Sequence, residues 1–495
     1  MCVCLASLWG KAFFVPFCRT NLKREGDRNM KLIYGIQDKP KFGQTILFAL
    51  QQLLAIMAAT IAVPSIIGHG MSPAAALFGA GVGTLVYLLF TKFRSPVFLG
   101  SSFAFLGSMA AAFAGGVSMS LGYLGLIIGA AFAGLVYVVI AIIVKLTGAK
   151  WVEKVMPAVV IGPTVAIIGL SLAGNAIGDL FSGNVSHEVI EKAIENNAIV
   201  EVTNYAQNAS PYLCLLCGLV TLFVTMLCSV YGKKMLRMIP FIIGICAGYA
   251  LAAIFTVIGN ANGNAAMQII DFSKFQNMQW IPDFTFVTAF SGNYDFGEVG
   301  YISTYIATIA VAYIPVAFVV FAEHIADHKN ISSIIETNLL EKPGLHRTLL
   351  GDGIGSMAGA LFGGCPNTTY GESIGCVAIS GNASVVTILT TAILAMLISF
   401  VAPFSTFLAT IPSCVMGGVC IALYGFIAVS GLKMVQKVDL EDNRNLFVVS
   451  VILIAGIGGM NISVGPVLIT EVACALILGI VTNVLLNRKH AKDVE

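Results

Sequence analysis

A succession of apolar runs, each about 20 residues long, constrains the fold of this chain more than any other feature of its sequence. The runs begin at Phe42 and continue almost to the C-terminus. Apolar residues make up 57% of the chain and charged residues only 11%, whereas a soluble domain carries roughly 25% charged residues. Because about 20 apolar residues suffice to cross a bilayer as a helix, the sequence predicts an all-α polytopic membrane protein in a lipid bilayer.

We expect about 14 transmembrane segments, which is the number that the apolar content of the chain can supply. Most of the connections are short, and two longer polar loops lie at 176–210 and 260–302. Residues 1–29 hold only one short apolar stretch, so Met30 is a second candidate for the start of the chain. The expected segments are 43–68, 73–91, 96–113, 120–146, 155–175, 211–231, 238–259, 303–327, 347–363, 365–381, 384–402, 404–431, 445–461 and 466–486.

Positive charges predict the orientation of these segments. Lys and Arg accumulate in cytoplasmic loops, and with the N-terminus inside, 25 of the 27 basic residues fall in cytoplasmic segments. The exceptions are Lys192 and Lys274, one in each of the two long loops. We therefore expect both termini in the cytoplasm, both long loops outside, and a location in the cytoplasmic membrane.

Net charge and cysteine content exclude several other classes of protein. The net charge is only +2 and the chain has no long basic run, so no nucleic-acid partner is expected. Nine of the twelve cysteines lie in apolar segments, where they are interpreted as small core residues rather than disulfides. Cys214 and Cys217 have redox-motif spacing, but no His or acid nearby completes a zinc site. We expect no metal and no cofactor.

An internal repeat relates the two halves of the chain. Gly79–Thr84 (GAGVGT) matches Gly351–Ser356 (GDGIGS) at an offset of 272 residues, and the same offset places Gln51-Gln52 on Glu323-His324. Each copy holds seven expected segments, an odd number, so the second copy enters the membrane from the opposite side. Inverted repeats of this kind are typical of transporters. The glycine runs themselves predict close helix packing through small residues.

The third and tenth expected segments, 96–113 and 365–381, differ from the other segments. Both begin with Gly and Pro residues, and both carry consecutive hydroxyl residues at the expected middle of the membrane. This pattern indicates broken helices, whose free backbone N–H groups can bind a polar ligand in a cavity. Two short helices kinked by proline are the alternative interpretation.

Acidic residues inside the expected segments mark the candidate site. The clear cases are Glu323, Asp327 and Glu372, and His324 and His328 lie beside the first two. A carboxylate in hydrocarbon costs about 3 kcal/mol or more, so these groups are expected to face a cavity and to serve a function. The alternative is that neighbouring hydroxyl groups or lipid headgroups satisfy them. A further acid, at position 352, is expected nearer a segment end.

Three strings resemble the nucleobase–cation symporter-2 (nucleobase–ascorbate transporter) family, and within it the bacterial uracil permeases: Gly100–Phe105, Ala322–Ile325 and Pro366–Gly375. The resemblance implies a fold of two inverted seven-segment repeats, with substrate between a core domain and a gate domain. In this division the chain comprises an N-terminal cytoplasmic segment (1–41), the core domain (42–146 and 303–403), the gate domain (147–260 and 404–487), an extracellular loop (261–302) and a cytoplasmic tail (488–495).

The resemblance also implies a substrate site. Acids at the positions of Glu323 and Glu372 bind the base, and backbone amides at Phe103 and Gly371 contact it where the two half-helices begin. Uracil has two N–H donors and two carbonyl acceptors, which require acceptor oxygens and fixed N–H donors respectively. The rings of Tyr370 and Phe103 are candidates for packing against the base.

The candidates for proton coupling are Glu323, Asp327 and His328. The sequence departs from the family pattern at two places. Many members have Gln-His where this chain has Gln51-Gln52, and some uracil permeases have His at the position of Asp327.

The expected function is proton-coupled import of uracil by alternating access, and not catalysis. A xanthine or other purine permease of the same family is the alternative. Outside this class, an anion channel or exchanger with the same fold would need cationic residues at the site. An intramembrane aspartyl peptidase would need two aspartates in Tyr-Asp and Gly-x-Gly-Asp contexts, which the sequence does not show. Association into a homodimer is left open.

Overall fold

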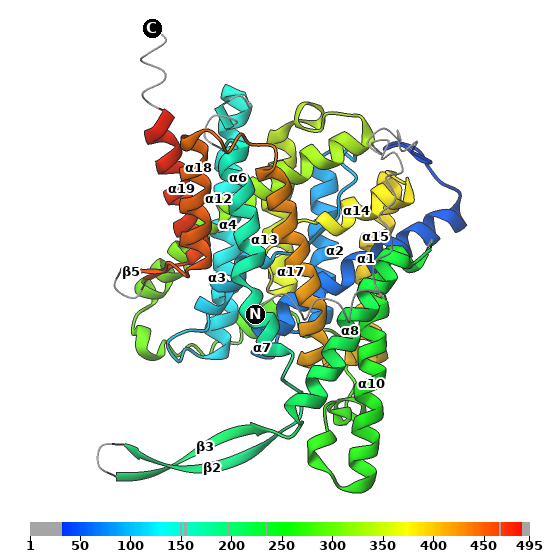
Figure 1. Cartoon of the computed structure of the whole chain (residues 1–495), viewed down its shortest axis with the longest axis vertical. Helices are drawn as coiled ribbons and strands as arrows, with labels where there is room; N and C mark the ends of the chain where they lie inside the picture. The colour runs from blue at the N-terminus through cyan, green and yellow to red at the C-terminus, as the bar shows by residue number, and fades with distance from the viewer. Residues whose placement is uncertain are drawn as a thin grey trace, which may run out of the picture. The chain divides into compact units, whose positions relative to one another are not determined.

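The computed structural model of the chain describes residues 32–148, 151–152, 156–195, 198–233, 235–464 and 467–487. Part of the predicted cytoplasmic N-terminal segment, including Met30, and the predicted tail 488–495 lie outside the described residues. The helices that follow are therefore those of the described part of the chain (Figure 1).

Each expected transmembrane segment coincides with one or two helices. In the first half these are α1 (Phe42–Ile67), α2 (Pro73–Phe90), α3 (Leu106–Ala111), α4 (Met119–Thr147), α6 (Ala158–Ser171), α7 (Ala173–Asp179), α8 (Pro211–Tyr231), α9 (Met235–Met238) and α10 (Pro240–Asn262). In the second half they are α12 (Ile302–Ile335), α13 (Leu345–Gly363), α14 (Gly371–Ser380), α15 (Val385–Ile398), α16 (Ala402–Thr410), α17 (Ser413–Val435), α18 (Asn443–Ile457) and α19 (Glu471–Asn487), and the short helix α11 (Thr285–Ala289) lies in the expected loop 261–302.

Short elements join these helices. The strands are β1 (Leu99–Ser101), β2 (Ser186–Glu195), β3 (Ala198–Gln207), β4 (Asn367–Thr369), β5 (Ile462–Val464) and β6 (Val467–Ile469). The single-turn helices are η1 (Phe103–Phe105), η2 (Ala265–Met267), η3 (Phe272–Gln276) and η4 (Gly297–Val299), and a π-helical turn covers Leu340–Gly344.

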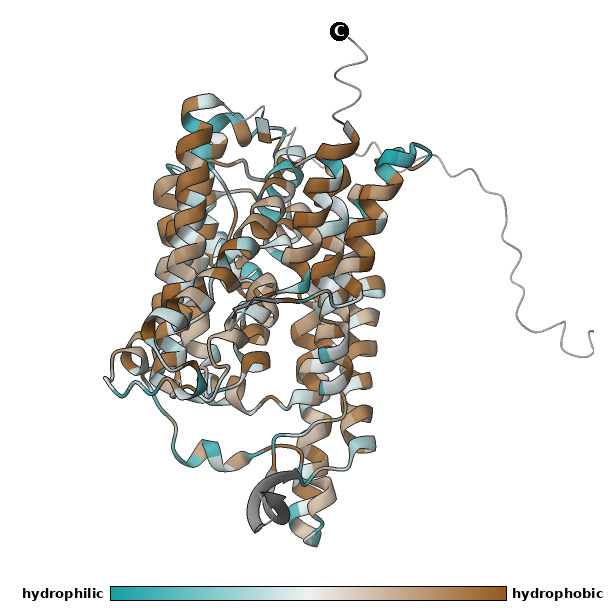
Figure 2. Cartoon of the chain, turned by 90° about the vertical axis from the view of Figure 1, so that its left-hand side faces the viewer, coloured by the Kyte–Doolittle hydropathy of each residue, from teal (hydrophilic) through white to brown (hydrophobic). Residues whose placement is uncertain are grey.

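Several of these helices are long enough to cross a bilayer. Among the described residues, eight helices are long and apolar enough to do so, or nine if the pair α15 and α16, bent by 85°, is one span. Figure 2 shows apolar residues along the lengths of the helices, with most of the hydrophilic residues toward their ends. The multi-pass membrane fold is confirmed, and the number of fourteen crossings stays a prediction.

Two predicted segments differ from the structure in detail. The expected segment 404–431 is divided at Ile411–Pro412, because Pro412 has no N–H to donate to a continuing helix and instead caps the start of α17. The expected loop 176–210 contains a regular antiparallel hairpin of β2 and β3, in which Ser186 faces Gln207.

The third and tenth segments are broken, as expected. β1 leads into η1 and α3, and β4 leads into α14. The two strands pair with each other in antiparallel register, with Gly100 opposite Thr368. One segment from each copy of the repeat therefore meets the other by backbone hydrogen bonds inside the protein. The pairing supplies the strands with partners that lipid cannot supply.

The two glycine runs pack against each other, which confirms their interpretation as small-residue helix contacts. A Cβ atom added at Gly79 would lie 2.4 Å from the carbonyl oxygen of Gly359 in α13, and one added at Gly355 would lie 2.7 Å from the carbonyl oxygen of Gly83 in α2. The Asn367 amide donates to the carbonyl oxygen of Gly79, at 3.2 Å. The repeat thus brings α2 and α13 close enough to hold β4 between them.

The remaining helices pack in two sets. In one set α13 packs on α2 and α4, α15 on α1 and α2, and α12 on α4. In the other set α17 packs on α6 and α8, α10 on α8, and α18 on α6 and α19. The broken segments belong to the first set, and α12 contacts both broken segments.

The two long loops lie together at one end of the helices. The Asn184 N–H donates to the carbonyl oxygen of Ile269 at 3.0 Å, and the Ser210 N–H donates to that of Ala266 at 2.8 Å. Figure 1 shows β2 and β3 leaving the helices at the same end as the loop after α10. Their shared side agrees with the charge pattern, which predicts one location for both loops.

Candidate functional site

A cavity of about 330 Å³ lies where the two broken segments, α12 and α17 meet. Six of the predicted site residues line it, from three separate parts of the chain: Phe103, Glu323, Asp327, Tyr370, Gly371 and Glu372. The lining also includes Phe241 and Phe426 from the second set of helices. The structure therefore gathers nearly the whole predicted site around one cavity.

The strand-to-helix junctions place backbone N–H groups at this cavity. α14 begins at Gly371, directly after Tyr370, and the first N–H groups of a helix have no carbonyl partner within it. Gly371 is exposed, and a Cβ atom added there would meet no atom within 4 Å. The opposite junction begins at Phe103, where β1 gives way to η1. Both helix starts carry positive dipole ends that favour electronegative ligand atoms.

Tyr370 fixes the two broken segments to each other. Its hydroxyl donates to the carbonyl oxygen of Ser101, at 2.7 Å. Its ring covers Gly100, where a Cβ atom would come within 2.3 Å of the ring carbons. Tyr370 is only 3% exposed, so its ring chiefly packs on β1. Phe103, also predicted to contact the base, packs edge-on against Tyr424 with ring centres 5.4 Å apart.

Glu323 and Asp327 lie one turn apart on α12, and both line the cavity. The Thr369 hydroxyl at the end of β4 donates to Asp327 Oδ2, at 2.7 Å. Glu323 and Glu372 are half-buried, and neither carboxylate makes a hydrogen bond or ion pair with another side chain of the described residues. These two carboxylates are therefore available to a ligand, whereas Asp327 is already held by Thr369.

His328 lies apart from the cavity. It is fully buried, its Nδ1 lies 2.8 Å from the carbonyl oxygen of His324, and its Nε2 lies 2.7 Å from the Tyr87 hydroxyl. Because a carbonyl oxygen only accepts, Nδ1–H donates to it, and in the neutral ring Nε2 accepts from Tyr87. The hydroxyl of Tyr87 also lies 2.6 Å from that of Ser95. His328 therefore has its partners away from the other predicted site residues.

The structure corrects the expected place of Asp352 near a segment end. Asp352 lies within α13 and is 1% exposed. Its Oδ2 lies 2.6 Å from His324 Nδ1, and His324 Nε2 lies 3.0 Å from the Thr348 hydroxyl. The hydrogen bond to His324 gives the buried carboxyl group of Asp352 a partner in place of water. Among the described residues, no three His, Cys, Asp or Glu side chains form a metal-ligand group.

A second cavity, of about 990 Å³, continues from the first toward one end of the helices. Five residues line both cavities: Ala326, Asp327, Asn330, Phe426 and Ser430. A third cavity, of about 320 Å³, lies at the end of the long loops and includes Asn184 and Lys274 in its lining. It shares no lining residue with the first. The site is therefore connected to one end of the helices and separate from the cavity at the other.

Comparison with known proteins identifies relatives along nearly the whole chain. The sequence model of the permease family matches residues 43–465. A uracil permease of Bacillus caldolyticus is 38% identical over 463 residues, covering 92% of this chain and 95% of the relative. A uracil permease of Bacillus subtilis is 35% identical, covering 94% and 98%. One from Escherichia coli is 34% identical, covering 90% and 92%.

Solved structures show the same fold at low sequence identity. The transmembrane domain of the cyanobacterial bicarbonate transporter BicA matches with a TM-score of 0.59 and 16% identity, covering 90% of this chain and 99% of that domain. Murine Slc26a9, an anion transporter in the inward-facing state, matches with a TM-score of 0.57 and 12% identity, covering 92% and 70%. These similarities confirm the predicted inverted-repeat membrane fold.

Proposed function

This chain belongs to the permease family, and we propose that it imports uracil across the cytoplasmic membrane together with protons. Members of that family are transporters, so the chain is a permease and not an enzyme. Relatives named as uracil permeases cover 90% or more of the chain. Their names support uracil as the substrate proposed here.

One observation carries the proposal: two helix starts border the same cavity as two carboxylates, Glu323 and Glu372, for which the described residues provide no side-chain partner. Glu323 and Glu372 supply acceptor oxygens for the two N–H groups of uracil. The N–H groups at Phe103 and Gly371 supply donors for its two carbonyl oxygens. A volume of about 330 Å³ is at the small end of ligand pockets, as suits a single ring.

The proposed transport cycle moves a core domain, spans 1–4 and 8–11, against a gate domain, spans 5–7 and 12–14. Both broken segments belong to the core. Phe241, Phe426 and Ser430 come from the gate and face them across the cavity. A shift of the core along α10 and α17 would close the site to one end and open it to the other. In the present conformation the site connects to the end that the charge pattern assigns to the cytoplasm.

Proton coupling is proposed because uracil is neutral at pH 7, so the membrane potential alone cannot concentrate it. One proton moving through 100 mV supplies about 2.3 kcal/mol, which is roughly 50-fold accumulation. Glu323 and Asp327 are the proposed carriers, since both border the base cavity. His328 is the third proposed carrier. Its ring bonds to the His324 carbonyl oxygen and the Tyr87 hydroxyl, so its role in coupling would be indirect.

Uptake by the purified chain in proteoliposomes tests the function. Radiolabelled uracil should accumulate when the outside is acidic and the inside negative, and a protonophore should abolish accumulation. Unlabelled uracil should compete better than xanthine. Better competition by xanthine would replace uracil with a purine as the substrate, and equilibration without accumulation would contradict proton coupling.

Labelling of introduced cysteines tests the proposed orientation. In a background without the native cysteines, single cysteines in 260–302 should react with an impermeant reagent added to intact cells. Cysteines in 432–444 should react only after the membrane is opened. Labelling of 432–444 in intact cells would contradict cytoplasmic termini. Light scattering of the purified protein tests the open prediction of a homodimer.

A further inference from the structure

Arg237 is the one cationic residue in the described lining of the base cavity, the cavity of about 330 Å³. It lies on α9, in the short connection between α8 and α10. Three carboxylates, those of Glu323, Asp327 and Glu372, line the same cavity. All three acids come from the proposed core, whereas Arg237 comes from the proposed gate. Opposite charges therefore border this cavity from the two domains whose relative movement is proposed to transport uracil.

The connection that carries Arg237 is short and tightly turned. α8 ends at Tyr231, and the N–H of Gly232 donates to the carbonyl oxygen of Cys228, at 3.0 Å. A Cβ atom added at Gly232 would lie 3.0 Å from the backbone nitrogen of Arg237. α10 starts at Pro240, only three residues after Arg237. The two helices therefore hold Arg237 at a fixed place on the gate.

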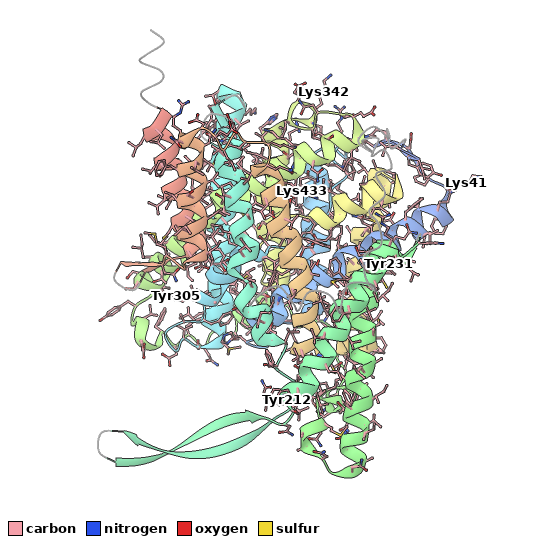
Figure 3. The ribbon with its side chains drawn as sticks, in the orientation of Figure 1. Lys41, Tyr212, Tyr231, Tyr305, Lys342 and Lys433 are labelled. Atoms are coloured by element: carbon pink, nitrogen blue, oxygen red, sulfur yellow. The ribbon has the colours of Figure 1, made fainter. Side chains whose placement is uncertain are left out.

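α9 contacts the proposed core at the end of the helices that the charge pattern assigns to the cytoplasm. It packs on α14 and on α1. Figure 3 shows Tyr231, the last residue of α8, at the opposite end of that helix from Tyr212 and on the side where Lys41 precedes α1. Arg237 therefore lies where the gate meets the core on the cytoplasmic side of the base cavity.

One face of α14 borders the base cavity. The residues of α14 that line it are Glu372, Gly375, Cys376 and Ile379. Residues three, four or seven apart share one side of a helix. Glu372 is therefore the carboxylate that lies on the core helix contacted by α9, whereas the other two acids of the cavity lie on α12.

Arg237 and Glu372 are apart in the present conformation. The guanidinium group of Arg237 forms no ion pair with the described residues, and Glu372 has no side-chain partner among them. A guanidinium group can donate two parallel hydrogen bonds to a carboxylate. A movement of the core that closes the cytoplasmic side would bring α14 and α9 closer together, and with them these two groups.

A transporter that imports uracil must also return to the outside without it. On that return the emptied cavity closes, and a carboxylate enclosed there without a partner is costly. In the proposed cycle the base and the proton are the partners of the acids during import. On the return, the guanidinium group of Arg237 can replace the base as the partner of Glu372.

We propose that Arg237 pairs with Glu372 when the empty transporter closes its cytoplasmic side, and that this pair permits the return to the outside. The inference rests on the proposed function, because it assigns Glu372 to the base during import. Arg237 is a positioning residue in this cycle, since it acts through the carboxylate and not on uracil. Net uptake needs the empty return, whereas exchange of uracil between the two sides does not.

Net uptake and exchange by the full-length chain in proteoliposomes test the proposal. Radiolabelled uracil enters vesicles that either lack uracil or are preloaded with unlabelled uracil. In Arg237→Gln, net uptake should fall by about tenfold or more, the effect of losing one charge-assisted hydrogen bond. Exchange should stay within about twofold of the parent, which also shows that the variant is folded and binds uracil.

Two further variants assign the effect to the charge at position 237. Arg237→Lys should restore part of the net uptake, because it keeps the positive charge but not the two parallel hydrogen bonds. Lys233→Gln is the matched control and should change neither rate. Lys233 is an exposed cation of the same connection and is not among the lining residues of the base cavity.

A cross-link tests the contact between α9 and α14 directly. Cys376 is a native residue on the face of α14 that carries Glu372. In a chain that retains Cys376 and lacks the other native cysteines, Arg237→Cys should form a disulfide with Cys376 when copper phenanthroline oxidises the two thiols. Lys233→Cys in the same background is the control and should form none.

The outcomes separate the proposal from a merely structural role. Loss of net uptake with retained exchange, together with the cross-link, supports it. Equal loss of both rates, unchanged net uptake in Arg237→Gln, or absence of the cross-link overturns it. If the parent neither binds nor exchanges uracil, the proposed function fails together with this inference.

Discussion

The two copies of the repeat share a scaffold and differ in chemistry. β1 and β4 are equivalent strands that pair with each other, and each leads into a helix at the cavity. The first copy carries Gln51-Gln52 where the second carries Glu323-His324. In the first copy, the Gln52 amide donates to the Ser373 hydroxyl at the start of α14, and so supports the other copy's half-helix. The structural role thus falls to the first copy and the ionisable groups to the second.

The glycines of the two broken segments show the same division. Gly100 of β1 lies under the ring of Tyr370, with no room for a side chain. Gly371 at the start of α14 borders open space in the cavity. One glycine permits close packing between the copies, and the other permits a ligand to approach the backbone. In this inverted repeat both copies therefore supply the geometry of the site, whereas the second copy alone supplies the acids.

Moving the acid of position 323 to the equivalent position of the first copy should produce the largest loss of uracil accumulation. Glu323→Gln removes a carboxylate that can titrate, so the roughly 50-fold accumulation of uracil in proteoliposomes should be lost. Adding Gln51→Glu to that variant should not restore it, because Gln51 is buried and is not among the residues that line the cavity, whereas Glu323 is. Recovery of accumulation in the double variant would contradict the division between the copies.

Glu372→Gln should weaken uracil binding more than it weakens proton coupling. The variant loses a charge-assisted hydrogen bond to a uracil N–H, worth about 1.5–3 kcal/mol, so uracil affinity should fall by roughly 10- to 150-fold. Uptake at saturating uracil should remain sensitive to a protonophore. Glu298→Gln, an exposed acid in the loop before α12, is the control and should bind uracil like the parent. An unchanged affinity of Glu372→Gln would remove this residue from the site.

Replacing Gly100 with Ala should mainly lower stability, whereas replacing Gly371 with Ala should mainly weaken uracil binding. Gly100→Ala forces a methyl group against the Tyr370 ring, so it should lower the free energy of unfolding by about 1–3 kcal/mol. Gly371→Ala should leave thermal stability unchanged, because its Cβ meets no atom, but should weaken uracil binding. Differential scanning fluorimetry and binding to the same preparations separate the two effects. Equal loss of stability in both variants would contradict the difference in packing between Gly100 and Gly371.

Asp327→Asn should produce the smallest change in binding. Asn can still accept the hydrogen bond from Thr369, so uracil affinity should stay within about threefold of the parent. The dependence of uptake on external pH between 5 and 8 should become flatter, because Asn cannot titrate. Asp439→Asn, an exposed residue after α17, serves as the control. An unchanged pH profile would exclude Asp327 from coupling.

The sequence could predict features that depend on local composition or on large energies. The apolar runs predict the spans, and the cost of a carboxylate in lipid singles out Glu323 and Glu372. The glycine pattern predicts the contact of α2 with α13. It could not predict the Thr369–Asp327 hydrogen bond or the buried partners of His328, because these depend on how distant segments meet. Three-residue strands such as β1 form through tertiary pairing rather than through intrinsic propensity.

Two further differences between the sequence-based expectations and the structure have specific causes. The sequence does not predict the break inside the expected segment 404–431, because Thr410–Ser413 lies in an apolar run whose hydropathy hides the effect of Pro412. The burial of Asp352 could not be predicted, because its partner, His324, lies on another helix, α12.

Equilibrium binding of uracil to the parent chain and to Glu323→Gln tests the central claim most directly. Isothermal titration calorimetry gives both affinities in the same detergent and at the same pH. If the second copy's carboxylate accepts a uracil N–H, the dissociation constant of Glu323→Gln should be about 10- to 150-fold higher than that of the parent. Equal dissociation constants would contradict the assignment of Glu323 as the residue that recognises the base.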